Sequence, residues 1–212
     1  DGDKTGTQVY SLGHHRGKLV AGTWPEGKVY RHEGGTNWVS TGRLGQEQEI
    51  MSFNHYNGKL YAGSLPMAEV FRYDGGEEWK SVGRVDLTEK VIYRRAYSMA
   101  VFKGRLFSGA FPSGHVRSFE AGKVVSYDRE LKHGWRHIAA VKTGGKLKLF
   151  IDGKRAAESE AFDANSFDLT NDAPLQIGFG QYNYFNGRIR DVRLYRRALT
   201  ESEVNQLQTN RK

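Results

Sequence analysis

Short runs in which apolar and polar residues alternate, separated by glycine-containing turns, make up most of the chain. Alternation with a period of two places the apolar side chains on one face of a strand. The clearest runs are residues 51–56, 60–64, 69–73 and 79–82. Asn57-Gly58 joins the first two runs and is the strongest short-range hairpin signal, whereas Pro66 excludes a central strand at its own position. The pattern predicts four antiparallel strands in this stretch.

The same pattern occurs three times, at offsets of 41 and then 46 residues. Its most regular features are a turn glycine and a later proline, which recur as Gly17, Gly58 and Gly104 and as Pro25, Pro66 and Pro112. The first two copies also share a tryptophan, Trp38 and Trp79, which the third copy lacks. A recurring unit of this length is typical of repeat architectures. We predict a polar tail at 1–8 and three repeats within 9–122, at 9–49, 50–95 and 96–122.

The repeated unit resembles kelch-like and related β-propeller repeats over roughly residues 8–130. Four antiparallel strands in a unit of this size correspond to one propeller blade. Propellers close with about four to eight blades, so three copies leave two open sheet edges. Three explanations stay open: flanking blades are missing, chains associate as a homo-oligomer to complete a ring, or the C-terminal segment covers an edge.

After about residue 122 the pattern changes to a second set of predicted strands, at 135–141, 146–151, 175–180 and 185–195. Thr200 and Glu203 have the spacing of a capping box, which predicts a short helix through Leu207. The segment 123–212 resembles the C-terminal half of a laminin-G-like, concanavalin A-like jelly roll. The predicted fold class is therefore all-β: antiparallel four-stranded propeller-blade-like repeats, followed by a jelly-roll-like β segment with a short C-terminal helix.

Composition and charge narrow the choice of compartment and partner. The chain has no cysteine, which excludes disulfides and thiolate chemistry, and no apolar run approaches the length of a membrane span. It begins at Asp1 without a methionine, so we expect a processed protein or an excised piece. The expected location is secreted or periplasmic, in a bacterium. The net charge of +8 favours an acidic partner. Acidic polysaccharide ranks above nucleic acid, because the sequence shows no recognition helix or single-strand binding motif.

Two groups of residues are candidates for ligand binding. Large apolar residues precede the repeated prolines and would either stack on sugar rings or fill the gaps between blades. Arginines beside tyrosines, in the insertion before the third repeat, suit a carboxylate or sulfate, because a guanidinium group binds such anions bidentately. Tyrosines also occur on a loop between Gly180 and Gly187. The candidates are Trp24, Tyr93, Arg94, Arg95, Tyr97, Phe111, Tyr182 and Tyr184.

Catalytic and metal-binding candidates are fewer. A polysaccharide lyase would use Arg95 to neutralise a uronate carboxylate and His115 or Tyr97 to move protons. A glycoside hydrolase needs a carboxylate pair, for which Glu69 is a candidate. Calcium is an option at Asp1-Gly2-Asp3, which lacks a closing glutamate, or at Asn171-Asp172 with Asp191. No cofactor is otherwise predicted.

These observations support three functional hypotheses. The first is a non-catalytic carbohydrate-binding module, lectin-like or accessory to an enzyme, that favours acidic polysaccharide. The second is a polysaccharide lyase or glycoside hydrolase that acts at the mouth of the repeats. The third is a protein-interaction scaffold.

Overall fold

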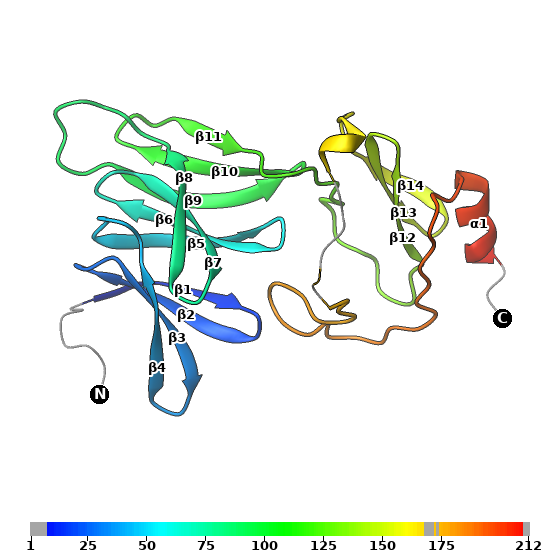
Figure 1. Ribbon diagram of the computed structural model, residues 1–212, viewed down its shortest axis with the longest axis horizontal. Helices are drawn as coiled ribbons and strands as arrows, with labels where there is room; N and C mark the ends of the chain where they lie inside the picture. The colour runs from blue at the N-terminus through cyan, green and yellow to red at the C-terminus, as the bar shows by residue number, and fades with distance from the viewer. Residues whose placement is uncertain (1–7, 168–171, 173, 210–212) are drawn as a thin grey trace. The chain divides into compact units, whose positions relative to one another are not determined.

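The computed structural model describes residues 8–167, 172 and 174–209. The described chain is all-β, with antiparallel sheets and one short α-helix (Figure 1). It divides into two compact units. The repeat unit contains the described residues through Val101 together with Leu106–Phe119 and Leu175–Arg188. The C-terminal unit contains Phe102–Arg105, the described residues of Glu120–Pro174, and those from Ile189 onward.

The repeat unit contains three sheets, in each of which neighbouring strands follow one another along the chain (Figure 1). The first sheet comprises β1 (Gln8–His15), β2 (Lys18–Trp24), β3 (Lys28–Gly34) and β4 (Asn37–Arg43). The second comprises β5 (Glu49–Tyr56), β6 (Lys59–Leu65), β7 (Glu69–Gly75) and β8 (Glu78–Arg84). The third comprises β9 (Arg95–Phe102), β10 (Arg105–Phe111) and β11 (Val116–Phe119). The four strands predicted from residues 51–82 are therefore present.

The repeated residues also pair in the same register in the first two sheets. Val9 pairs with Thr23 in the first sheet, and Ile50 pairs with Ser64 in the second. A β-bulge follows each of these pairs, at positions that correspond by the repeat offset. The second strand of every sheet ends immediately before its proline. The three prolines therefore occupy equivalent places at one end of the strands.

Adjacent sheets of the repeat unit approach each other closely at glycines. A Cβ atom added to Gly22 would lie 2.4 Å from Cβ of Ile50, and one added to Gly63 would lie 2.4 Å from the carbonyl oxygen of Ala96. Hydrogen bonds also join the sheets, because Ser11 Oγ donates to the carbonyl of Ile50 at 2.7 Å. The main buried cluster of this unit is formed by Val20, Val29, Leu44, Ile50, Leu60, Ala62, Phe71 and Tyr73.

A carboxylate in each linker between sheets holds the proline loop of the following repeat. Glu47 accepts a hydrogen bond from the backbone N–H of Met67 at 3.1 Å, and Asp86 accepts one from the N–H of Ser113 at 2.9 Å. Burial raises the pKa of Glu47. Burial also disfavours ionisation of Asp86, but hydrogen bonds from Ser113 and Thr88 outweigh it and lower the pKa of that carboxyl.

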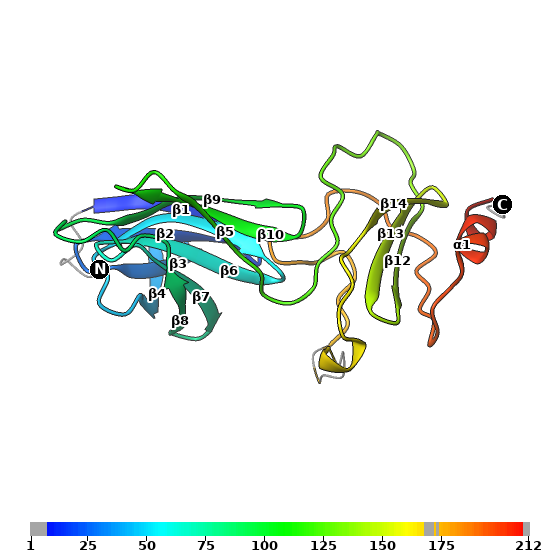
Figure 2. The same ribbon diagram turned by 90° about the horizontal axis from the view of Figure 1, so that it is seen from above.

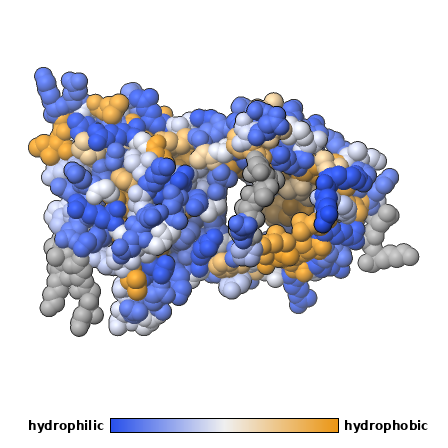
Figure 3. Space-filling view, viewed as in Figure 1, coloured by the Kyte–Doolittle hydropathy of each residue, from blue (hydrophilic) through white to orange (hydrophobic). Residues whose placement is uncertain are grey.

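The linker between β8 and β9 is the insertion that the sequence predicted before the third repeat. Figure 3 shows hydrophobic side chains at the surface here, where Leu87 and Ile92 are 73% and 79% exposed. Backbone hydrogen bonds hold both ends of the linker, since Val85 N–H donates to the carbonyl of Ala68 and Arg94 N–H to that of Pro66.

The C-terminal unit contains one three-stranded sheet, a 3₁₀ turn and the helix. Its elements are β12 (Ile138–Thr143), β13 (Lys146–Ile151), β14 (Lys154–Glu158), η1 (Ala164–Ser166) and α1 (Glu201–Thr209). The helix α1 lies beside the sheet of β12, β13 and β14 (Figure 2). Val141 and Phe150, on one face of this sheet, pack against Val204 of α1. The predicted capping box is present, because Glu203 N–H donates to Thr200 Oγ1 and Thr200 N–H donates to Glu203 Oε2.

Two predicted strands are wrong in this structure, and one strand was not predicted. Residues 175–180 and 185–195 have irregular backbone, apart from an isolated bridge between Phe179 and Tyr184. Alternation predicted strands there, but a strand also needs a hydrogen-bonded neighbour. The apolar side chains of these segments are exposed, among them Leu175, Ile177, Ile189, Val192 and Leu194. The strand β14 was missed, because its residues after the Asp152-Gly153 turn are mostly polar or small.

Candidate functional site

The ends of the strands beside the three prolines form an edge that we call the proline rim. The residues on this edge follow from the pairing between the first two strands of each sheet. Gln8 pairs with Trp24 in the first sheet, and Glu49 pairs with Leu65 in the second. The corresponding residues of the third sheet are Arg95 and Phe111, at which β9 begins and β10 ends. The rim therefore changes from neutral to acidic to basic across the three sheets.

Arg95 lies among aromatic rings at the third sheet. Its Cζ atom is 5.0 Å from the ring centroid of Phe111 and 5.9 Å from that of Tyr97. Phe111 is 45% exposed and Tyr97 is 48% exposed. A guanidinium group within about 6 Å of an aromatic ring is attracted to it, and the ring fixes its orientation. Three of the predicted ligand-binding residues therefore lie together at the surface.

Tyr10 and Glu49, from the first and second sheets, extend this group, and we call the five residues Tyr10, Glu49, Arg95, Tyr97 and Phe111 the rim cluster. A hydrogen bond with Tyr97 is the main cause that raises the pKa of Tyr10. Burial raises the pKa of Glu49, and the positive charge of Arg95 opposes that increase. Tyr10 and Glu49 were not predicted from the sequence. Repeat alignment was the signal that could have found them, because Tyr10 corresponds to Tyr97 and Glu49 to Arg95.

The remaining candidates in the repeats occupy other surroundings. Trp24 has the place in the first sheet that Phe111 has in the third, and it is 38% exposed. Tyr93 is exposed on the linker, and Arg94 Nε donates to the carbonyl of Thr88 at 2.6 Å. His115 Nδ1 lies 3.4 Å from a guanidinium nitrogen of Arg117. Glu69 forms an ion pair with Arg84, 3.3 Å from its Nε.

Tyr182 and Tyr184 lie at the opposite strand ends, on a loop that covers two hairpin turns of the repeats. Arg16 N–H donates to the carbonyl of Gln181 at 2.9 Å, and Gly17 N–H donates to that of Tyr182 at 2.6 Å. The side-chain oxygen of Gln181 accepts from Gly58 N–H at 3.0 Å. Because the turns and the proline rim are at opposite ends of the same strands, these tyrosines do not join the rim cluster.

Beneath this loop, two histidines form a pair between the first two sheets. His15 Nδ1 and His55 Nε2 are 3.2 Å apart, and the ring of Tyr182 lies 4.2 Å from that of His55. Burial is the main cause that lowers the pKa of both histidines to about 4. Nearby positive charges, among them Arg16 and Arg31 beside His15, act in the same direction. The pair is neutral at ordinary pH and has a packing role.

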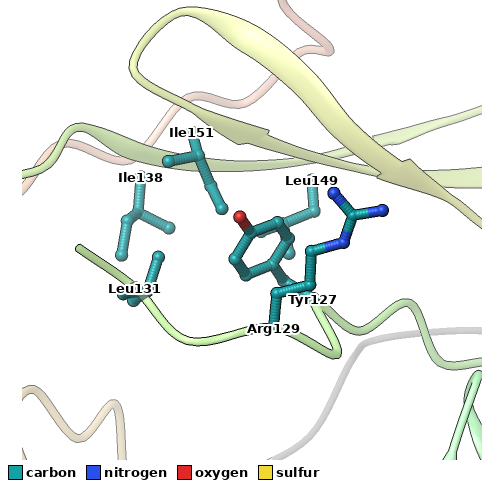
Figure 4. Close-up of a pocket in the computed structure, with 6 residues that line it drawn as sticks. All are labelled: Tyr127, Arg129, Leu131, Ile138, Leu149 and Ile151. Carbon is teal, nitrogen blue, oxygen red and sulfur yellow. The ribbon is translucent and has the colours of Figure 1, made fainter.

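The C-terminal unit contains an apolar hollow of about 310 Å³ (Figure 4). The chain segment that carries Tyr127, Arg129 and Leu131 forms one side of it. The other side is the sheet face opposite to α1, which carries Ile138, Leu149 and Ile151. Polar groups that would orient a ligand are few in it, so it is a weaker candidate for sugar recognition than the rim cluster.

The described residues contain no group of three or more histidine, aspartate or glutamate side chains placed to hold a metal ion. The predicted calcium candidates Asp1, Asp3 and Asn171 lie outside the described part of the chain. In the residues that the structure describes, no helix is both long enough and apolar enough to cross a membrane.

Comparison with known proteins identifies the class to which the fold belongs. The family model described as the concanavalin A-like lectin/glucanases superfamily, a laminin-G family, matches residues 88–205, which is more than half of the chain. The chain therefore belongs to this superfamily, whose members often bind carbohydrate. The match begins before β9 and so includes the third sheet of the repeats.

The other comparisons add little. The solved structure of an S-layer domain-containing protein (residues 221–444) from Clostridium thermocellum ATCC 27405 is similar at 17% identity and a TM-score of 0.32, covering 84% of this chain and 94% of that chain. No curated protein matches the chain. The comparisons give no support to the kelch-like resemblance, which stays a prediction.

Proposed function

We propose that this protein is a carbohydrate-binding module that recognises acidic polysaccharide at the rim cluster. The observation that carries the proposal is the position of Arg95 over Phe111 and beside Tyr97, with both rings exposed. Exposed aromatic rings offer flat apolar faces to the C–H groups of a sugar. A guanidinium group beside them can donate two parallel hydrogen bonds to a uronate carboxylate or a sulfate. Membership of a superfamily that often binds carbohydrate supports the same function.

The electrostatics of the site favour an anionic sugar over a neutral one. The chain carries a net charge of +8, which attracts polyanions at a distance. At short range, Arg95 is the basic member of the rim cluster and lies beside the exposed rings of Phe111 and Tyr97. Trp24 at the first sheet and Phe111 at the third give the rim more than one stacking surface. A polymer could therefore contact several repeats along the rim.

Titration calorimetry with a polyuronate, and with the same polymer after reduction of its carboxyl groups, tests the proposal. We expect the polyuronate to bind more tightly, and Arg95→Gln to remove most of that difference. Tyr97→Ala should weaken both polymers, because it removes a stacking face. Arg196→Gln, which changes an exposed arginine of the C-terminal unit, is the matched control. Equal affinities of Arg95→Gln and wild type for the polyuronate would reject the site.

The proposed module binds without turnover. Among the catalytic candidates, Arg95 and Tyr97 lie together, whereas His115 contacts Arg117 and Glu69 is paired with Arg84. Incubation with polyuronate, followed by measurement of ultraviolet absorbance from an unsaturated product and of new reducing ends, separates the functions. Either signal, if lost in Tyr97→Phe, would favour the lyase or hydrolase.

The domain arrangement and location belong to the same proposal. We propose repeats at 9–49, 50–95 and 96–122 and a sandwich-like segment at 123–212. A secreted or periplasmic location follows from the proposed ligand, since acidic polysaccharides are found outside the bacterial cytoplasm.

A further inference from the structure

Several residues of the first sheet are exposed although the corresponding residues of the second sheet are buried or packed against the first sheet. We call Val9, Leu12, His14 and Trp38 the leading face of the first sheet. Their counterparts in the second sheet are Ile50, Phe53, His55 and Trp79, which face the first sheet. Val9 is 60% exposed, whereas Ile50 is fully buried.

The same contrast holds at the other positions of the leading face. Leu12 is 63% exposed, but its counterpart Phe53 packs against the buried cluster. Trp79 Nε1 donates to the carbonyl of Thr41 in the first sheet at 2.8 Å, and its counterpart Trp38 is 38% exposed. The leading face therefore has the shape and chemistry of a surface that binds another sheet of this kind.

The third sheet exposes the complementary surface, which we call the trailing face and which consists of Ser98, Ala100, Phe107 and Gly109. Gly109 corresponds to Gly22 and Gly63, the glycines against which the following sheet packs. A Cβ atom added to Gly109 would meet only Ser98 Oγ, at 3.4 Å. Ala100 corresponds to Asn54, which donates to the carbonyl of Met99 in the next sheet. The position that receives a neighbour in the first two sheets is thus open in the third.

We propose that the leading face of one molecule binds the trailing face of a second copy of this chain, so that the stack of sheets continues between molecules. The interface would repeat two interfaces already present inside the repeat unit. It is heterologous, because two different surfaces meet, and such contacts close into a ring when the rotation between sheets allows it. Two chains supply six sheets, which lies within the range of about four to eight in closed propellers. The expected assembly is a ring of two chains, and it does not depend on carbohydrate binding.

Analytical ultracentrifugation over a range of concentrations tests the assembly. We expect the wild type to sediment at twice its chain mass of 24.0 kDa. Leu12→Lys places a charge in the interface, and Gly109→Leu fills the space that the partner needs. Each variant should reduce the association constant by at least about tenfold, because a buried unpaired charge or an overpacked contact costs more than 1.4 kcal/mol. Leu87→Lys, at an exposed leucine of the linker, is the matched control and should leave the mass unchanged.

A mixing experiment distinguishes a heterologous interface from a symmetric one. Leu12→Lys keeps an intact trailing face, and Gly109→Leu keeps an intact leading face. Each variant alone should be monomeric, and an equimolar mixture should form a one-to-one complex through the single intact pair of faces. A monomeric wild type would overturn the proposal and leave the leading face to a different partner. Association that Leu12→Lys does not weaken, or variants that fail to complement, would also overturn it.

Discussion

The repeat unit and the C-terminal unit bury their apolar side chains in different ways. In the repeat unit each sheet packs against the next, so Ile50 and Val70 become fully buried. In the C-terminal unit a single sheet is covered on one face by α1, which buries Phe150. Ile138, on the other face, is 56% exposed.

The difference shows what a repeat contributes to a core. A β-sheet is stable only when at least one of its faces is covered, and a repeated sheet supplies a surface that already fits its neighbour. The C-terminal unit lacks such a neighbour among the described residues, so apolar positions such as Ile138 and Ile189 stay at the surface. Three sets of variants test this difference between the two units.

The largest effect is expected on the covered face of the C-terminal sheet. Phe150→Ala removes a side chain that is 1% exposed, and deletion of a buried phenylalanine costs about 3–5 kcal/mol. Ile138→Ala, on the other face, should cost less than about 0.5 kcal/mol. Urea unfolding, with hydrogen exchange read in the amides of β12–β14, measures both. Similar costs for the two variants would show that both faces are covered.

The next effect concerns the contact between sheets in the repeat unit. Gly63→Ala places a Cβ atom 2.4 Å from the carbonyl oxygen of Ala96, and the resulting overpacking should cost about 1–3 kcal/mol. Gly180→Ala is the control, because no atom lies within 4 Å of its added Cβ. The free energy of unfolding in urea measures both changes. A neutral Gly63→Ala would mean that the sheets are not packed closely.

The smallest effect is expected from the histidine pair, for which the C-terminal unit has no equivalent in its described part. His15 and His55 have an ordinary pKa of 6.5 when unfolded and about 4 when folded. The unfolded chain therefore binds more protons between these values, and the stability that is present above pH 6.5 is lost as the pH falls toward 4. We expect a loss of about 1–2 kcal/mol after allowance for solvent screening.

Thermal unfolding across this pH range measures the effect. His55→Gln should make stability depend less on pH than it does in the wild type. Carboxylates that titrate in the same range contribute to both proteins, so the difference between the two curves removes their contribution. His133→Gln, at an exposed position of the C-terminal unit, is the control. If His55→Gln and wild type lose stability in parallel, the pair has no role in acid sensitivity.

Local signals in the sequence predicted the repeat well. Asn57-Gly58 and Pro66 fix a turn and a loop through their own backbone preferences, without help from distant residues. Arg95, Tyr97 and Phe111 of the candidate site were also predicted from local signals. Arg95 and Tyr97 were predicted because an arginine lies beside tyrosines in the sequence, and Phe111 because it precedes a repeated proline.

Features that depend on distant contacts could not be predicted in this way. Residues 185–195 have the alternation of a strand, but no strand among the residues that the structure describes pairs with them. The contact of Tyr182 with His55 joins residues far apart in the chain, and no local pattern marks it. Glu49 corresponds to Arg95 in the repeat alignment, but its position beside Arg95 depends on the packing of adjacent sheets and follows only from the structure.

The loop that carries Gln181 has a consequence for synthesis. The carbonyl and side-chain oxygens of Gln181 accept hydrogen bonds from the backbone N–H groups of Arg16 and Gly58, which lie in turns of the first two repeats. These turns leave the ribosome long before residue 181 is added. Domains generally begin to fold from the N-terminus while the chain is being made. The first two repeats must therefore stack with these turns open to water, and the loop covers them only after residue 181 has left the ribosome.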